Sequence, residues 1–117
     1  YAEDRVQFGR PIAKFQDLRF KIARMATEIE AARQLMYSVC VKIDEGGRCD
    51  KEAAMAKYFA AEMSERVTSD ALQILGGAGY THYFPVERYW RDARLTKIFE
   101  GTSEIQQRII SDHLLSR

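Results

Sequence analysis

The sequence predicts an all-α fold, an antiparallel four-helix bundle with up-down connections, in one domain over residues 1–117. Three observations support this class. Apolar residues recur in steps of three and four along long segments, which is the period of a helix. Clusters of glycine and proline divide the chain into four such segments, and no segment shows the alternation of a strand.

The first helix is predicted over residues 12–45. Pro11 suits its first turn, and Gly46-Gly47 suits its end. The pattern fits packing inside a bundle, and it also fits a coiled-coil seam. One apolar stripe follows the whole segment: Phe15, Leu18, Ile22, Met25, Ile29, Ala32, Met36, Val39 and Ile43.

Three more helices are predicted, over residues 50–75, 86–98 and 103–115. Asp50 can cap the second helix, whose small apolar residues allow a close approach of neighbouring helices. The glycines at 76, 77 and 79 end that helix, and Pro85 opens the third. The buried face of the second helix is predicted to hold Ala56, Ala60, Met63, Val67, Ala71 and Ile74.

The composition excludes several classes of function. The 18 basic and 17 acidic side chains are interspersed, so no basic face for nucleic acid is predicted. No apolar run reaches the length of a membrane span. Cys40 and Cys49 lack the spacing of a zinc site and no metal is predicted; two reduced thiols are favoured over a disulfide. His82 and His113 are interpreted as non-catalytic.

Glu100 is the first candidate for catalysis. It lies between the apolar residues Ile98 and Phe99 and a glycine, Gly101, that permits a sharp turn. Apolar neighbours desolvate a carboxylate and make it a better proton acceptor. The spacing of Ser103 and Gln106 predicts a helix capping box just after it. The alternative is a surface acid favoured by the helix dipole.

Two loops are candidates for binding an anion. The glycines of residues 76–79 expose backbone N–H groups, but they end a helix and follow no strand, so they fail the context of a P-loop or Rossmann fingerprint. Residues 5–11 place an arginine, an amide and an aromatic ring before the long helix. A plain helix cap and solvated loop charges are the alternatives. Glu87 and Arg91 are predicted to form an ion pair on the third helix.

Four motifs, taken together, resemble the C-terminal helical domain of the acyl-CoA dehydrogenase family, in its short- and medium-chain branch. They occur in the family's order and at its spacing, along essentially the whole chain. They are Arg5-x-Gln7-Phe8-Gly9-x-Pro11 with Phe15-Gln16; Gln73-Ile74-Leu75-Gly76-Gly77-x-Gly79-Tyr80; Pro85-Val86-Glu87-Arg88 with Arg91-Asp92-Ala93; and Ile98-Phe99-Glu100-Gly101-Thr102-Ser103-Glu104-Ile105.

The resemblance implies an FAD-dependent α,β-dehydrogenation of an acyl-CoA thioester. Glu100 is then the base that removes the α-proton while a hydride leaves for FAD. Gly101 and Phe99 would lie near the substrate, although a tyrosine is frequent at the position of Phe99, and glutamine also occurs at that of Glu104. The implied FAD contacts are Arg5, Gln7, Phe8, Phe15, Gln16, Gln73, Ile74, Leu75, Gly76, Gly77, Thr102, Ser103 and Glu104.

The resemblance also implies partners. These are the acyl-CoA substrate, an electron-transfer flavoprotein as electron acceptor, and further copies of the chain in a homodimer or homotetramer. The compartment would be the bacterial cytoplasm or the mitochondrial matrix. We expect the chain to be a piece of a longer protein, inactive by itself. A non-catalytic oligomerisation module and an acyl-CoA oxidase-type relative are the alternatives, whereas Glu100 counts against a nitroalkane-oxidising flavoprotein.

Overall fold

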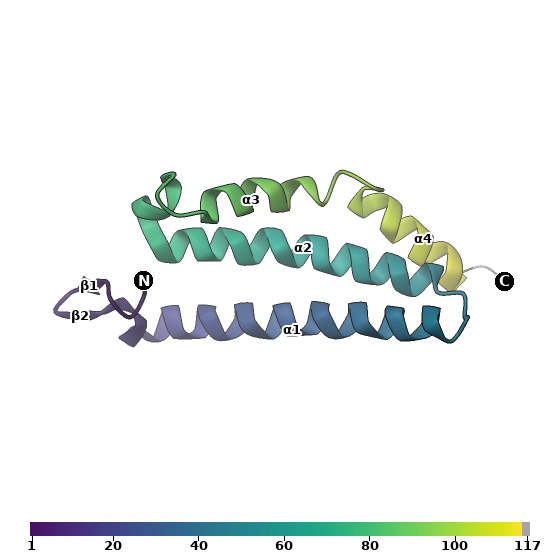
Figure 1. Cartoon of the computed structure of the whole chain (residues 1–117), viewed down its shortest axis with the longest axis horizontal. Helices are drawn as coiled ribbons and strands as arrows, with labels where there is room; N and C mark the ends of the chain where they lie inside the picture. The colour runs from purple at the N-terminus through teal and green to yellow at the C-terminus, as the bar shows by residue number, and fades with distance from the viewer. Residues whose placement is uncertain (116–117) are drawn as a thin grey trace.

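The computed structural model describes residues 1–115 and confirms the predicted all-α class (Figure 1). Four helices are packed together, and a small hairpin precedes them. Two short 3₁₀ segments, η1 and η2, flank α1 and α2. The elements in order are β1 (Val6–Gln7), β2 (Arg10–Pro11), η1 (Ile12–Lys14), α1 (Gln16–Asp44), α2 (Asp50–Leu75), η2 (Gly76–Tyr80), α3 (Val86–Leu95) and α4 (Ser103–Leu115).

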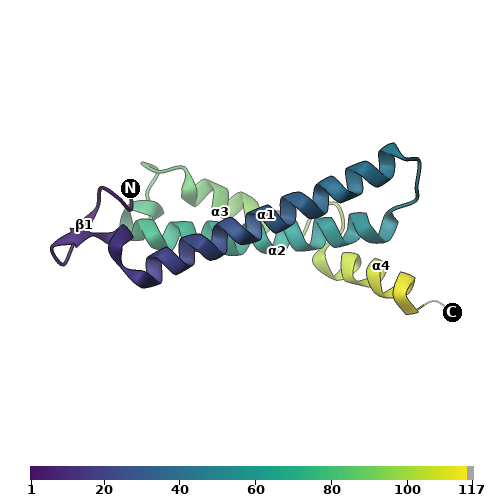
Figure 2. The ribbon, with the colours of Figure 1, turned by 90° about the horizontal axis from the view of Figure 1, so that it is seen from below.

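Helix α2 is the centre of the molecule. It runs antiparallel to α1, which packs on one side, while α3 and α4 follow one another along the other side (Figure 1). Figure 2 shows that α1 crosses α2 obliquely and that α4 bends away from the line of α3. The result is elongated, with extents of 61 × 25 × 23 Å. The turn between α3 and α4 therefore lies against the middle of α2.

The first fifteen residues differ from the prediction. The sequence predicted no strand, but β1 and β2 pair in antiparallel register, Val6 with Pro11 and Gln7 with Arg10. Strands of two residues carry no periodicity that a sequence pattern could reveal. The long helix also begins at Gln16 rather than near residue 12, because Phe15 is extended, with φ −78° and ψ 131°. The third helix ends at Leu95, three residues before the predicted end.

The core is small and built largely from alanine. The buried apolar residues are Ala32, Val39, Ala54, Ala61, Val86 and Ala93. Alanine lets helices approach closely, but it removes little apolar area from water. Many larger apolar side chains consequently remain at the surface of this chain.

The predicted stripe on α1 divides into two rows. Ala32 and Val39 are buried toward α2, whereas Ile22, Met36 and Ile43 are 42%, 48% and 56% exposed. The reason is that α2 is the only helix within residues 1–115 that makes extensive contacts with α1. The second row therefore remains available to something outside this chain.

Polar pairs complete the α1–α2 interface. Asp70 on α2 accepts hydrogen bonds from Lys21 at 3.1 Å and from Arg24 at 3.0 Å. Burial opposes the charged carboxylate, but the hydrogen bonds from Arg24 and Lys21 outweigh it and lower the pKa of Asp70. Cys40 and Cys49 are both free thiols. Within the described chain, no helix is both long and apolar enough to cross a membrane.

Candidate functional site

Two residues stand out by backbone conformation. Phe8 and Glu100 both have φ +52°, and among residues 1–115 they are the only non-glycine residues with positive φ. The left-handed region costs an L-residue roughly 1–2 kcal/mol, and such strain gathers at functional sites. Both residues were candidates on sequence grounds, so the structure adds an independent reason to consider them.

Glu100 lies in the tight turn between α3 and α4. The turn is closed by backbone hydrogen bonds from Phe99 N to Leu95 O at 3.2 Å and from Ser103 N to Lys97 O at 3.1 Å. Gly101 follows with φ +90°, and a Cβ at this position would lie 2.6 Å from Nε2 of Gln106. The glycine predicted to permit a sharp turn is therefore favoured by its backbone conformation, and a side chain here would displace the Gln106 amide from the turn.

Side chains from two helices hold this turn. Lys57 Nζ on α2 donates to Gly101 O at 2.6 Å and to Thr96 O at 2.7 Å. From α4, the buried Gln106 donates through Nε2 to Gly101 O at 3.3 Å, with Glu100 O at 3.5 Å. Neither role is recognisable in the sequence, because a hydrogen bond to a backbone carbonyl requires no particular partner residue.

The predicted capping box is wrong. Ser103 is buried and donates its hydroxyl to Glu62 on α2 at 2.8 Å, instead of capping the helix. Thr102 is the cap, because its Oγ1 accepts the N–H of Ile105 at 3.3 Å. The predicted pair of Glu87 with Arg91 is also not formed; Glu87 Oε1 lies 2.9 Å from Nδ1 of His82.

Charges on α2 reinforce the same turn. Lys97 contacts Glu65 at 2.8 Å and Glu62 at 3.0 Å, and these hydrogen bonds raise the pKa of Lys97. Burial opposes the charge on Glu62, but hydrogen bonds from Lys97 and Ser103 lower its pKa. Hydrogen bonds from its own backbone and from Thr102 lower the pKa of Glu104. The segment that carries Glu100 is thus tied to α2 on both sides.

The Glu100 side chain itself is exposed in this chain. Its apolar neighbours do not cover it, since Ile98 is 53% and Phe99 47% exposed. The predicted desolvation is therefore not provided within residues 1–115. It requires a molecule or a protein segment that covers Ile98, Phe99 and Glu100 together.

A second feature is a cleft of about 670 Å³ at the C-terminal end of α2. It joins the hairpin to the end of α2, two regions that the sequence treated as separate candidates. Gln16, although predicted with them, does not line it. The predicted residues that line the cleft are Arg5, Gln7, Phe8, Phe15, Gln73, Ile74, Leu75, Gly76 and Gly77.

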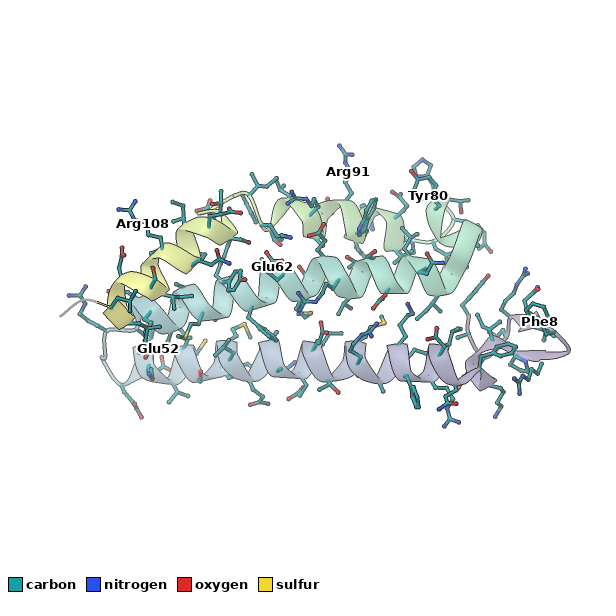
Figure 3. The ribbon with its side chains drawn as sticks, turned by 180° about the vertical axis from the view of Figure 1, so that it is seen from behind. Phe8, Glu52, Glu62, Tyr80, Arg91 and Arg108 are labelled. Carbon is teal, nitrogen blue, oxygen red and sulfur yellow. The ribbon has the colours of Figure 1, made fainter. Side chains whose placement is uncertain are left out.

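The cleft suits a ligand with anionic groups and a flat ring. Phe8 is 91% exposed at the hairpin tip and meets Phe15 edge to face, with ring centroids 6.1 Å apart (Figure 3). The guanidinium of Arg10 lies 4.3 Å from the centre of the Phe15 ring. Gly76 and Gly77 face open space where side chains would stand, so a ligand can approach the backbone closely. The Arg5 guanidinium adds a donor fork for a phosphate.

The two features are far apart. Lys57, which touches the Glu100 turn, and Gln73, which lines the cleft, lie on the same helix and are separated by about 24 Å at 1.5 Å per residue. Figure 3 shows the same arrangement, with Glu62 in the middle of α2 on the side of α3 and α4, and Phe8 at the far tip of the hairpin. A single chain therefore does not bring Glu100 together with the cleft.

The chain is thus a helical domain with an open cleft at the C-terminal end of α2 and a tightly hydrogen-bonded turn against the middle of that helix. The chain belongs to the acyl-CoA dehydrogenase family: residues 1–115 match the family model described as acyl-CoA dehydrogenase, C-terminal domain.

Known proteins resemble the chain closely over nearly all of its length. An acyl-CoA dehydrogenase of Bacillus subtilis is 54% identical, over 98% of this chain and 30% of that protein. The caffeyl-CoA reductase-Etf complex subunit CarC of Acetobacterium woodii is 46% identical, over 100% of this chain and 31% of that protein. The structure of butyryl-CoA dehydrogenase from Megasphaera elsdenii matches with a TM-score of 0.96 and 47% identity, over 98% of this chain and 30% of that one. This chain thus spans about a third of the length of these relatives.

Proposed function

We propose that the chain is the C-terminal domain of an FAD-dependent acyl-CoA dehydrogenase, and that Glu100 is the base that removes the α-proton of the acyl-CoA thioester. The observation that carries the proposal is the conformation of Glu100, which is held at positive φ by bonds from α2 and α4. A carboxylate that must meet a C–H bond needs such fixed placement, because effective proton transfer depends on a short, aligned approach.

The residues of the turn then have distinct roles. The Glu100 carboxylate accepts the proton as the α C–H bond breaks, and FAD, when bound, supplies the acceptor for the β-hydride. Phe99 and Gly101 lie on either side of the base and would border the reacting part of the substrate. Because Ile98 and Phe99 are exposed, a bound acyl chain that covers them would exclude water and make Glu100 a stronger base.

The cleft fits the groups by which FAD would be held. Arg5 offers a fork for the pyrophosphate, and the exposed backbone of Gly76 and Gly77 allows close approach. Phe8 and Phe15 offer ring faces and edges beside the amides of Gln7 and Gln73. Ile74 and Leu75 line the same cleft, whereas the remaining proposed FAD contacts lie outside it: Gln16, Thr102, Ser103 and Glu104.

The role proposed for Ser103 is restricted by its surroundings. Its hydroxyl is engaged with Glu62, so a contact from Ser103 to FAD would use the backbone. Glu104 is exposed, with a pKa lowered by its own backbone N–H and by Thr102, and would present an ionised carboxylate where the family also uses glutamine.

Two observations favour a homo-oligomer of the complete protein. Lys57, which touches the Glu100 turn, and Gln73, which lines the cleft, are about 24 Å apart along α2, so the cleft of one subunit and the turn of another could serve one cofactor. In addition, Ile22, Met36 and Ile43 leave an uncovered row along α1. Dimer and tetramer both satisfy these requirements.

An electron-transfer flavoprotein is the proposed electron acceptor. The support is CarC, a relative that belongs to an Etf complex. The compartment proposed is the bacterial cytoplasm or the mitochondrial matrix. An acyl-CoA oxidase-type enzyme, the second candidate for the electron acceptor step, would pass electrons to oxygen instead.

The proposal is tested in the complete enzyme with Glu100→Gln, an isosteric change that cannot accept the proton. We expect butyryl-CoA turnover with an artificial electron acceptor to fall by about 10²–10⁴-fold, the usual contribution of a general base. The flavin spectrum and the thermal midpoint should be unchanged. Glu30→Gln, the same change at an exposed acid on α1 outside the proposed site, is the matched control and should retain most of the activity. Full turnover by Glu100→Gln would refute the assignment.

The same assay tests the expectation about the isolated chain. Titration of residues 1–117 with FAD should give no tight binding, and butyryl-CoA should not be turned over, because Phe8 in the cleft and Glu100 in the turn are both exposed. Robust turnover by the isolated chain would contradict the composite site.

A further inference from the structure

Lys57 makes the shortest side-chain hydrogen bond to the Glu100 turn among the residues that the structure describes. It is half-buried on α2, and its ammonium reaches the turn by two short hydrogen bonds, 2.6 Å to Gly101 O and 2.7 Å to Thr96 O. None of the ion pairs among residues 1–115 includes Lys57. Its charge is thus directed at backbone carbonyls and not at a carboxylate.

The two acceptors lie at the two ends of the turn. Thr96 O belongs to the C-terminal end of α3, where helix carbonyls lack partners and the helix dipole favours a cation. Gly101 O belongs to the residue that directly follows Glu100. One ammonium group therefore fixes the separation of the turn's ends, between which Glu100 is held at positive φ.

The second donor to the turn cannot replace this contact. Gln106 Nε2 approaches Gly101 O at 3.3 Å and Glu100 O at 3.5 Å, distances that are long for hydrogen bonds. It also comes from α4, which begins immediately after the turn. Lys57 comes from the central helix α2, so its hydrogen bonds connect the turn to the rest of the domain.

We propose that Lys57 is a positioning residue for the base. By binding the carbonyls of Thr96 and Gly101, it sets where the Glu100 backbone lies relative to α2, and hence where the carboxylate meets the substrate. This inference rests on the proposed role of Glu100. Lys57 touches neither substrate nor cofactor in this role, and it acts only through the turn.

The test uses the complete enzyme with Lys57→Met, which keeps the length of the side chain and removes its donors. We expect kcat to fall by about 10²-fold, the scale of a 1 Å misplacement, with KM and FAD content nearly unchanged. The kinetic isotope effect with α-deuterated butyryl-CoA should rise, because proton removal becomes more rate-limiting. Lys57→Arg, which restores donors, should recover part of the rate.

Lys97→Met is the matched control. Lys97 also joins the turn to α2, but through Glu62 and Glu65 and not through a carbonyl beside Glu100. It should lower the thermal midpoint with a smaller change in kcat and an unchanged isotope effect. Equal effects of Lys57→Met and Lys97→Met on kcat and isotope effect would overturn the proposal and leave a merely structural cross-link.

Two further variants, Lys57→Gln and Glu100→Gln, are measured beside these. If Lys57→Met does not accumulate as holoenzyme, Lys57→Gln, whose amide is too short to span both carbonyls, is measured instead; a wild-type kcat for it would overturn the proposal. Glu100→Gln is measured in parallel. An active Glu100→Gln enzyme would refute the proposed base, whereas an inactive Glu100→Gln enzyme beside a fully active Lys57→Met enzyme would refute only the positioning role.

Discussion

The turn around Glu100 and the cleft beside Phe8 are built in opposite ways. Side-chain hydrogen bonds from Lys57 and Gln106, and the contact between Ser103 and Glu62, hold the turn. Backbone hydrogen bonds within the turn also close it. The cleft is open, with Phe8 91% exposed and two glycines facing empty space. Both contain a non-glycine residue at positive φ, yet only one is tied to the core.

The contrast reflects two different tasks. A base must be fixed before the substrate arrives, because error in its position lowers the rate directly. A surface that holds a large cofactor gains its order from the ligand and from the neighbouring subunit, and it must leave room for them. Changes to the backbone of the turn should therefore alter catalysis and folding together, whereas changes to the cleft should alter binding alone.

Of the changes that test this contrast, Gly101→Ala should have the largest effect on activity and stability. The alanine Cβ would lie 2.6 Å from Gln106 Nε2, on a backbone with φ +90°. We expect the complete enzyme to lose about 10²-fold in kcat and about 1–3 kcal/mol in free energy of unfolding. Both are measured on one preparation, by steady-state turnover and by urea titration.

Gly77→Ala is the control from the cleft. Gly77 has no positive φ, and its added Cβ would meet nothing within 4 Å. Stability should be unchanged, while the FAD dissociation constant rises because the Cβ intrudes on the ligand's approach to the backbone. Equal destabilisation by the two alanines would show that the turn and the cleft do not differ in the way described.

The four helices, apart from a few residues at their ends, and the turn at Glu100 could be predicted from the sequence. Long apolar periods and glycine clusters indicate α1 and α2, and Gly101, next to Glu100, indicates the turn. The sequence could not reveal the hairpin of residues 6–11, because two-residue strands depend on the positive φ of Phe8 and Gly9 and not on a repeating pattern.

The contacts that hold the site were beyond the sequence for a different reason. Ser103 satisfies the capping pattern, but Glu62, 41 residues away, is the partner that it binds. Lys57 reads as one more charge on an amphipathic helix, since its acceptors are carbonyls that every residue carries. Only the packing of the α3–α4 turn on α2 decides which donors and acceptors meet.

Arg5→Gln should have an intermediate effect, confined to binding. Losing a charge-assisted hydrogen bond to a phosphate costs about 1.5–3 kcal/mol, which corresponds to a rise of roughly 10- to 100-fold in the FAD dissociation constant. Arg19→Gln is the control, because Arg19 is exposed on α1 and does not line the cleft. Fluorescence titration of the apoenzyme measures both. Equal weakening by the two changes would indicate a general charge effect instead of a phosphate contact.

The smallest expected effect on stability concerns Asp70 at the interface between α1 and α2, which supports both regions. Burial opposes the charge on Asp70, yet the hydrogen bonds from Arg24 and Lys21 lower its pKa below the unfolded value of about 3.9. Such a carboxylate stabilises the fold above the unfolded pKa, and its contribution is lost as the pH falls through the folded pKa.

Asp70→Asn should therefore lower the free energy of unfolding by about 1–2 kcal/mol at pH 7, and this difference should shrink as the pH falls below about 4. Urea titrations of both complete enzymes at several pH values measure the difference. A difference between Asp70→Asn and the unaltered enzyme that stayed constant down to pH 3 would mean that the ion pairs across α1 and α2 do not stabilise the fold through the charge of Asp70.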